Sequence, residues 1–189
     1  ELTTAEVKGV VKFTGDKVPK RRPVDMEVEA KCSGQHKEPV LSEDVIVNTN
    51  GTVKNVFVYV RKGLEKWTFT PPATEVVLEQ KGCTYVPHVF GIQVGQTLRI
   101  KNGDPLAHNV HGVGKANGDF NFSQPTQGKE DTKVFQYPEI LLMVKCDVHG
   151  WMQGWLVATE NPYFAVTDNS GGFKLTDVPA GTYTVEVWH

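Results

Sequence analysis

Short apolar stretches alternate with polar and turn residues along the whole chain. Val, Thr and aromatic residues are frequent in these stretches, whereas no segment of about a dozen residues keeps the helical period of about 3.6. We therefore expect strands over residues 7–13, 44–48, 53–63, 75–80, 89–94, 97–102, 132–137, 139–146, 154–160, 163–167, 172–178 and 182–189. The pattern predicts an all-β protein built as an antiparallel sandwich or barrel.

Gly, Pro, Asn and Lys gather between the apolar stretches, and several Asn-Gly pairs are typical of tight turns. Residues 66–73 and 114–130 are rich in such residues and are expected to be excursions from the sheets. A helical turn after Gly63 or near Gly114 is the most helix that the sequence predicts.

Composition and charge exclude some classes of function. The 189 residues have a formal net charge of −2, without the basic surface that nucleic-acid binding requires. No apolar run approaches the roughly 18–20 residues that span a bilayer as a helix. The polar start, Glu1 to Thr4, is what we expect of an exported chain whose signal peptide is already absent.

The chain has three cysteines, Cys32, Cys83 and Cys146. An odd number suggests one disulfide and one thiol with a separate role. If Cys32 and Cys83 form the disulfide, the protein resides in an oxidising compartment and Cys146 is free. The alternative is three reduced, buried cysteines.

Residues 145–152, KCDVHGWM, place a thiol, an imidazole and a thioether at three-residue intervals, at Cys146, His149 and Met152. These donors together favour copper, whereas zinc sites favour further thiolates or imidazoles. A copper centre that changes oxidation state takes two histidines, one cysteine and a weak axial sulfur. One histidine is therefore missing from this loop, and His108, after a predicted strand and a proline-containing turn, is the candidate.

The segments PLAHNVH (105–111) and CDVHGWM (146–152) resemble the copper-binding segments of the cupredoxins, the type 1 blue copper proteins related to amicyanin and plastocyanin. The Cys-x2-His-x2-Met spacing is most similar to that of amicyanin, and residues 88–110 resemble the family's approach to its first histidine. The resemblance implies a Greek-key β-sandwich that holds one type 1 copper ion. Its ligands would be His108, Cys146, His149 and, in the axial position, Met152.

The residues around these ligands have expected roles of their own. Asn109 is expected to fix the loop and tune the thiolate through hydrogen bonds outside the ligand shell. Trp151, Leu106 and Pro105 are expected to form an apolar patch around an exposed edge of His149, where redox partners dock. For Trp151 the alternative is that it shields the ligand loop from water.

The other histidines are expected to lie outside this site. His111 lies three positions after His108, so an extended strand directs the two side chains to opposite faces. His36, His88 and His189 have no partner at a spacing diagnostic of a metal site. A second metal site among them is an alternative that the sequence leaves open.

The ends of the chain resemble a second kind of β module. Residues 164–189 are similar to the last strands of carboxypeptidase regulatory-like and transthyretin-like modules, and residues 7–30 to their opening. We therefore expect N-terminal strands in 1–45, a copper domain in 46–160 and a regulatory-like module in 161–189. Either the two ends of the chain pair into a small second sandwich, or they extend the sheets of the copper domain.

The resemblance implies an electron-transfer protein of the periplasm, or another extracytoplasmic space, and not an enzyme. Its partners would be redox proteins such as a cytochrome or a copper or quinone enzyme. One alternative is a type 1 copper relay module of a larger copper enzyme, which needs a further His-rich centre. The other is a copper-binding structural module.

Overall fold

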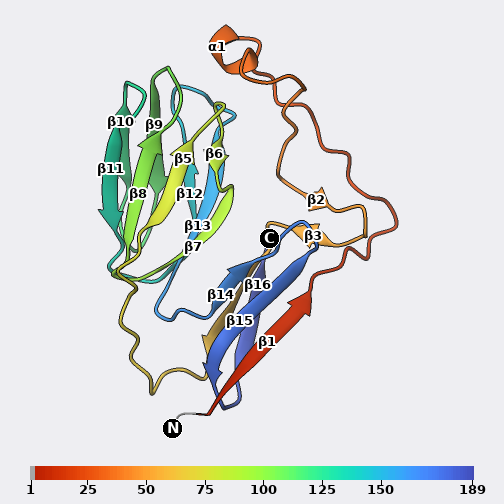
Figure 1. Cartoon of the computed structure of the whole chain (residues 1–189), viewed down its shortest axis with the longest axis vertical. Helices are drawn as coiled ribbons and strands as arrows, with labels where there is room; N and C mark the ends of the chain where they lie inside the picture. The colour runs from red at the N-terminus through yellow and green to blue at the C-terminus, as the bar shows by residue number, and fades with distance from the viewer. Residues whose placement is uncertain (1–2) are drawn as a thin grey trace. The chain divides into compact units, whose positions relative to one another are not determined.

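The computed structural model describes residues 3–189, which fold into two compact units. The terminal unit consists of Glu1–Arg21, Glu43–Thr70 and Asn161–His189, and the central unit of Arg22–Ser42 and Pro71–Glu160. Within the described residues a single four-residue helix, α1 (Ala30–Ser33), accompanies strands β1 to β16, so the predicted all-β class is confirmed (Figure 1). No helix in this part of the chain is long and apolar enough to span a membrane.

The central unit is a sandwich of two sheets (Figure 1). The five-stranded sheet, in the order β10-β9-β12-β13-β7, contains β7 (Val89–Gln93), β9 (His108–Val113), β10 (Phe120–Gln124), β12 (Glu139–Lys145) and β13 (Gln153–Thr159). The four-stranded sheet, in the order β11-β8-β5-β6, contains β5 (Val76–Gln80), β6 (Tyr85–Val86), β8 (Thr97–Asn102) and β11 (Glu130–Val134). Most neighbours are antiparallel, but β13 and β7, and β5 and β8, run parallel.

Alternating side chains build the core between these two sheets. In β8, Leu98 and Ile100 are both 0% exposed and the residue between them is not buried, because successive side chains of a strand face opposite sides of the sheet. Ile92 and Leu156 enter the same cluster from the five-stranded sheet. Truncating one such side chain to alanine lowers the unfolding free energy by about 2–5 kcal/mol. This core therefore stabilises the sheets that carry the loops at the ends of the sandwich.

Residues 22–42 form a strap that belongs to the central unit. Its two arms pair through backbone hydrogen bonds, and it carries α1. Met26 and Cys32 of the strap are 4% and 0% exposed and pack into the core of the sandwich. A disulfide joins Cys32 to Cys83, 51 positions later in the sequence. The strap is therefore attached to the sandwich by a covalent bond as well as by apolar contacts.

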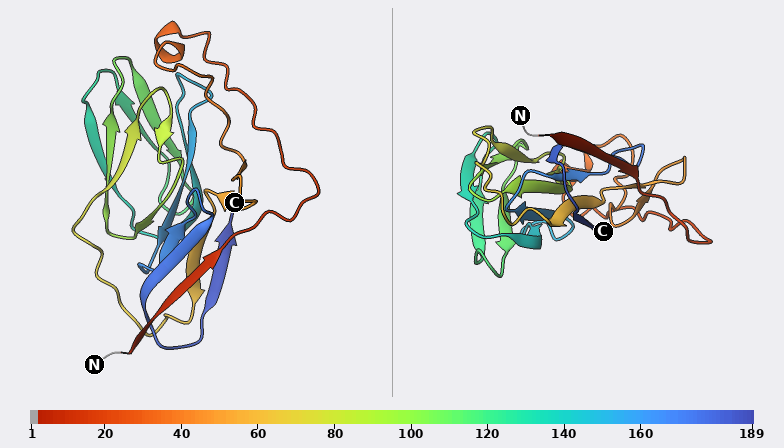
Figure 2. Two further views of the ribbon diagram at one scale, coloured as in Figure 1. Left: turned by 45° about the vertical axis from the view of Figure 1, so that its right-hand side comes forward. Right: turned by 90° about the horizontal axis from the view of Figure 1, so that it is seen from below.

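The terminal unit contains strands from both ends of the chain. The antiparallel pair β1 (Thr4–Val10) and β15 (Gly172–Pro179) lies side by side in Figure 2. A three-stranded sheet, in the order β14-β4-β16, contains β4 (Phe57–Lys62), β14 (Phe164–Val166) and β16 (Thr184–Trp188). The short pair β2 (Ile46–Val47) and β3 (Val53–Lys54) completes the unit.

Strand β4 is the centre of the terminal unit. Its first four residues are all buried rather than alternating, because both faces of the strand are covered. Val60 packs with Leu175 of β15 in one cluster, and Val58 packs with Val53 in another. The terminal unit is therefore a small β-sandwich with apolar cores of its own.

The two units divide the chain differently from the expected boundaries. Residues 46–70 lie in the terminal unit, outside the copper domain expected over 46–160, because β4 pairs with both β14 and β16. Residues 22–42 lie in the central unit, apart from the N-terminal strands expected over 1–45, because the strap is bonded there. The two chain ends lie together in one unit through the β1–β15 pair.

Some local expectations are wrong. The run 53–63 is two strands, because Asn55 takes a positive φ of 62° and interrupts the ladder. Strand β10 lies within 114–130, which was expected to be a loop, since Phe120 enters the core and the strand pairs with β9. Of the described residues only those of α1 are helical. After Gly63 the chain makes a single turn, in which the Trp67 N–H donates to the Leu64 carbonyl at 2.9 Å.

Candidate metal centre

The beginning of β9 and the end of β12 meet at one end of the five-stranded sheet. The strands are antiparallel, and Lys145, the last residue of β12, lies opposite His111 in β9. The first residue of β9, His108, therefore lies near the residue that follows β12, Cys146. The loop that leads to β13 carries His149 back to the same place, so the sheet register assembles side chains from two distant segments.

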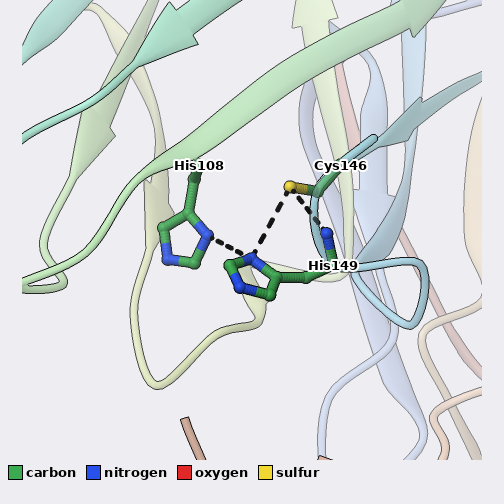
Figure 3. Close-up of side chains that lie close together, drawn as sticks. All are labelled: His108, Cys146 and His149. Carbon is green, nitrogen blue, oxygen red and sulfur yellow. Dashed lines mark hydrogen bonds between the residues drawn. The ribbon is translucent and has the colours of Figure 1, made fainter. Parts of the chain in front are cut away.

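Two imidazoles and one thiol converge at this end of the sheet (Figure 3). His108 Nδ1 and His149 Nδ1 are 2.9 Å apart, and His149 Nδ1 lies 3.9 Å from Cys146 Sγ. One donor atom of each residue lies within 4.8 Å of the others, and the residues are 2%, 4% and 3% exposed. Metal–nitrogen bonds of about 2 Å place neighbouring donors about 3–4 Å apart, so the three atoms are spaced to share one ion.

The ligand loop is held by its own backbone. The His149 N–H donates to Cys146 Sγ at 3.4 Å, and the Met152 N–H donates to the His149 carbonyl at 2.9 Å. The Cys146 N–H in turn donates to the Met152 carbonyl at 3.1 Å. Met152 is 1% exposed and belongs to the same apolar cluster as Cys146. The loop is therefore held by hydrogen bonds among its own residues.

The surroundings of Cys146 favour its thiolate. Burial raises the pKa of the thiol, but hydrogen bonds from His108 and from the backbone N–H groups of Asn109, His149 and Val148 outweigh burial. The pKa of Cys146 is therefore lowered from its ordinary value. A thiolate is the form that binds a metal.

Asp104 holds the other side of the His108 ring. Its carboxylate lies 2.9 Å from His108 Nε2 and is 1% exposed. Burial opposes the charged imidazolium, but the hydrogen bonds to Asp104 and Cys146 raise the pKa of His108 to about 8. Burial and the charge of His108 lower the pKa of His149. A metal that binds here at neutral pH therefore displaces a proton from His108.

Sequence reasoning missed Asp104. The signal was an acidic residue four positions before His108, next to the Asn102-Gly103 turn. That spacing alone is common in loops, so only the folded chain reveals the contact. The Asp104 carboxylate also accepts hydrogen bonds from the backbone N–H groups of Gly82 and Cys83, both at 2.7 Å.

Asn109 links β9 to the ligand loop. Its Oδ1 accepts a hydrogen bond from the Asp147 N–H at 2.7 Å and lies 3.3 Å from Cys146 Sγ. Its amide nitrogen donates to the Asp147 carboxylate at 2.9 Å. The Tyr85 hydroxyl, which sequence reasoning also missed, donates to the Asn109 carbonyl at 2.6 Å.

The remaining histidines within the described residues lie outside this group of donors. His111 lies against the Asp147 carboxylate, with Nδ1 3.0 Å from one oxygen. His36 Nε2 lies 2.7 Å from the Gly82 carbonyl, and His88 Nδ1 lies 3.0 Å from the Gln153 carbonyl. These contacts give the rings structural roles in turns and strand ends.

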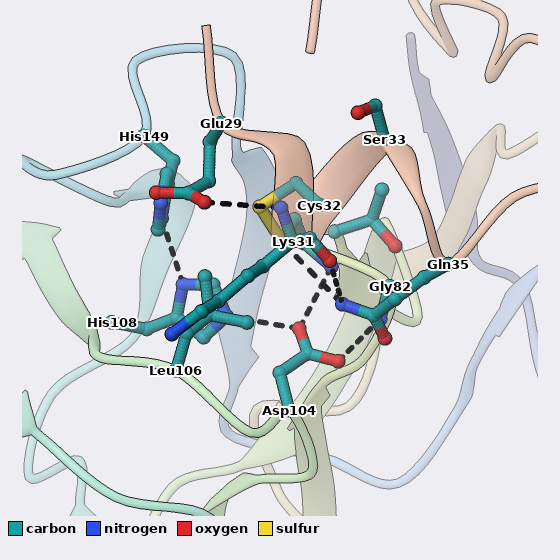
Figure 4. The surroundings of a disulfide bond; sticks show 12 residues. Glu29, Lys31, Cys32, Ser33, Gln35, Gly82, Asp104, Leu106, His108 and His149 are labelled. Carbon is teal, nitrogen blue, oxygen red and sulfur yellow. Dashed lines mark hydrogen bonds and ion pairs between the residues drawn. A yellow bond between two sulfur atoms is a disulfide. The ribbon is translucent and has the colours of Figure 1, made fainter. Parts of the chain in front are cut away.

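The expected exposed edge of His149 is not present, because His149 is only 4% exposed. The Trp151 ring lies 5.1 Å from the His149 ring, and its Nε1–H donates to the Cys83 carbonyl at 3.1 Å. The strap passes over the same region, where Glu29 precedes α1 (Figure 4). Of the residues expected in the docking patch, Pro105 is exposed, while Trp151 and Leu106 are partly buried and pack on the core.

Comparisons with known proteins find distant likenesses only. No protein-family model and no curated protein matches the chain. Amicyanin from Paracoccus versutus is 24% identical over 46% of this chain and 83% of that chain, with a TM-score of 0.40. A purple cupredoxin from Nitrosopumilus maritimus is 20% identical over 44% of this chain and 99% of that chain, with a TM-score of 0.37. A copper-containing nitrite reductase from Thermus scotoductus is 22% identical over 49% of this chain and 26% of that chain, with a TM-score of 0.40.

What the site can hold follows from its own side chains. A thiolate and two imidazoles, with a buried thioether three positions further on, are soft donors in the combination that copper prefers. Zinc sites of the structural kind carry four strong ligands, and methionine is not among them. The donors present therefore fit copper.

Proposed function

We propose that the protein is an electron carrier that uses one mononuclear type 1 copper ion, cycling between Cu(I) and Cu(II). The observation that carries the proposal is the buried convergence of His108 Nδ1, His149 Nδ1 and Cys146 Sγ within 4.8 Å. Met152 supplies the fourth, axial donor in the proposal, because it closes the ligand loop and is fully enclosed.

The rigidity of the donor set supports electron transfer as the function. When bound, the copper ion supplies a site that gains or loses one electron without forming new covalent bonds. The chain contributes a loop that its own hydrogen bonds hold in one form, from Cys146 to Met152. Donors that move little between the two oxidation states keep the barrier to electron transfer low.

We propose further that the protein is not itself an enzyme. Of the two donor groups found among residues 3–189, the second contains Cys83, whose sulfur is taken up by the disulfide, so it does not supply a thiolate for a second ion. A relay module within a larger copper enzyme remains the second candidate in the proposal only if another chain supplies a further centre.

The proposed partners are redox proteins that exchange one electron with the copper ion. We place the protein outside the reducing cytosol. The disulfide between Cys32 and Cys83 supports this location, since such bonds persist in oxidising compartments.

The test is optical and electron paramagnetic resonance spectroscopy of the purified chain after addition of one equivalent of Cu(II). We expect an intense visible thiolate-to-copper charge-transfer band and a narrow copper hyperfine splitting, both bleached reversibly by ascorbate. The Zn(II)-loaded chain is the matched control and should remain colourless. A pale adduct with wide hyperfine splitting would overturn the proposal.

A further inference from the structure

The Asp104 carboxylate connects the disulfide to a proposed metal ligand. One oxygen accepts the Gly82 N–H at 2.7 Å, and the other accepts the Cys83 N–H at 2.7 Å and lies 2.9 Å from His108 Nε2. The Asp104 N–H is itself bound by Asn102 Oδ1 at 2.9 Å. With 1% exposure the carboxylate is away from water, so these contacts determine its position.

The turn that presents the two N–H groups depends on the strap. Gly82 and Cys83 have positive φ values of 61° and 53°, the second unusual for a residue with a side chain. Such a conformation persists when surrounding contacts hold it. Here the disulfide holds Cys83 to Cys32 of α1, and His36 of the strap lies 2.7 Å from the Gly82 carbonyl. Figure 4 shows Asp104 between this turn and His108.

A second contact joins the same turn to the ligand loop. The Trp151 Nε1–H donates to the Cys83 carbonyl at 3.1 Å, and the Trp151 ring lies 5.1 Å from that of His149. The Cys83 N–H therefore binds Asp104, which contacts His108. The Cys83 carbonyl binds Trp151, which lies next to His149. A change in the conformation of the Cys83 backbone would therefore alter the contacts of both His108 and His149.

We propose that Asp104 is a positioning residue for the copper site and that the Cys32–Cys83 disulfide acts on the site through it. With the disulfide intact, the Gly82 and Cys83 N–H groups hold the carboxylate against His108 Nε2, so the ring presents Nδ1 to the metal. Without it, the strap and the turn are released, and Asp104 loses the donors that fix it. The inference rests on the proposed copper function.

Chemical reduction by a phosphine removes this restraint in the test below. The bond between Cys32 Sγ and Cys83 Sγ breaks, the two sulfurs receive two electrons and two protons, and the phosphine takes up the oxygen of a water molecule to become a phosphine oxide. Because coupling between two equilibria is reciprocal, bound copper should also make this disulfide harder to reduce.

The first experiment is a mutant cycle on Cu(II) affinity, measured by competition with a chelator. Cys32→Ser/Cys83→Ser and Asp104→Asn should each weaken binding about 10–100-fold, the usual effect of losing a residue that orients a ligand. The triple variant should bind no more weakly than the weaker of the two, because both changes remove the same contact. Fold-changes that multiply in the triple variant would overturn the proposal.

Asp131→Asn is the matched control, since this carboxylate of the central unit contacts Gln124 and Lys129 but no proposed ligand. Its Cu(II) affinity should stay within about twofold of the native value. An equal loss in this variant would mean that any lost carboxylate weakens binding, which contradicts a specific role for Asp104.

The second experiment uses the native chain without metal, so it does not depend on copper chemistry or on the folding of a variant. Nitrogen-15 NMR of the histidine rings and amide hydrogen exchange are compared before and after reduction with a phosphine. Reduction should shift the His108 Nε2 resonance and accelerate exchange of the Gly82 and Cys83 amides. Unchanged signals would overturn the proposal, whereas failure of the blue spectrum alone would overturn only the copper function.

Discussion

A single thiol, that of Cys146, limits what the central unit can do with a metal. It is 3% exposed, and its pKa is lowered chiefly by hydrogen bonds from His108 and neighbouring backbone N–H groups that outweigh the effect of burial. Within the ligand loop it is the only donor that would form a strongly covalent bond to the proposed copper ion. The colour of the loaded protein should therefore depend on this residue alone.

Cys146→Ala is expected to abolish the intense charge-transfer band of the copper-loaded protein, measured by absorption spectroscopy. Val148→Ala is the control, because Val148 lies in the same loop but is 61% exposed. The control should keep the native band. A Cys146→Ala protein that stays intensely coloured would contradict the ligand assignment.

Met152 is expected to act on the reduction potential rather than on the colour. In Met152→Leu the weak axial sulfur is lost, which favours Cu(I). The potential should rise by at least about 60 mV, a tenfold change in relative affinity for the two oxidation states. Spectroelectrochemistry measures this shift, and Met143→Leu, a half-buried change in β12, should leave the potential unchanged.

At the scale of elements, the short strand β6 supports the strand that carries His108. The Tyr85 hydroxyl of β6 donates to the Asn109 carbonyl of β9 at 2.6 Å, and the side chain is 2% exposed. Burial raises the pKa of Tyr85, followed by the charges of Cys146 and Asp147, so the hydroxyl keeps its proton. The bond therefore joins the two sheets beside the site under all ordinary conditions.

Tyr85→Phe should lower the unfolding free energy by about 1–3 kcal/mol, since it leaves the buried Asn109 carbonyl without this donor. Urea denaturation followed by fluorescence measures the change. Tyr137→Phe, at a side chain that is 61% exposed, should change stability by less than about 0.5 kcal/mol. Equal effects of the two substitutions would argue against a supporting role for β6.

Glu139, at the start of β12, ties that strand to the loop before β10. Burial raises the pKa of its carboxyl, but the Asn117 side chain and the N–H groups of Lys115, Asn117 and Ala116 outweigh burial and lower it below 4.5. A lowered pKa in the folded state means that the contribution to stability is present above pH 4.5. This contribution is lost as the pH falls through the lower, folded value.

Glu139→Gln should therefore reduce the unfolding free energy by about 1–3 kcal/mol at pH 7, with the difference from the native chain shrinking below pH 4.5. Chemical denaturation at a series of pH values measures this difference. The exposed substitution Glu38→Gln serves as control and should show no such pH-dependent loss. A difference that grows on acidification would contradict the assignment.

At the scale of the whole molecule, all the proposed ligands come from the central unit, from β9 and the loop before β13. Metal that binds only the folded state stabilises it by about 2.7 kcal/mol at a free concentration 100 times Kd. Removing copper with a chelator should accelerate amide exchange in β9, β12 and β13. Exchange in β14 to β16 of the terminal unit should not change, and equal acceleration in both units would contradict this assignment.

The sequence predicted the strands that follow a simple two-residue alternation, such as β8, whose buried positions can be read directly. It did not predict that β4 belongs with the chain ends, because its continuous apolar run matches a central strand in either unit. Strand β10 was also missed, since the short alternation of Phe120 and Phe122 lies within a region rich in turn formers. In these places the formation of a strand and the sheet that it joins depend on pairing partners far away in the sequence.

The sequence by itself determined which side chains are the candidates for the donor set. The Cys-x2-His-x2-Met spacing lies within one short loop, whose form depends on hydrogen bonds between residues only a few positions apart, and His108 begins the strand next to it. Only the tertiary structure decided that His149 is covered and that Asp104 joins the disulfide turn to His108. These contacts link residues separated by a strand or more, so they exist only once sheet register and side-chain packing have brought distant backbone groups within hydrogen-bond range.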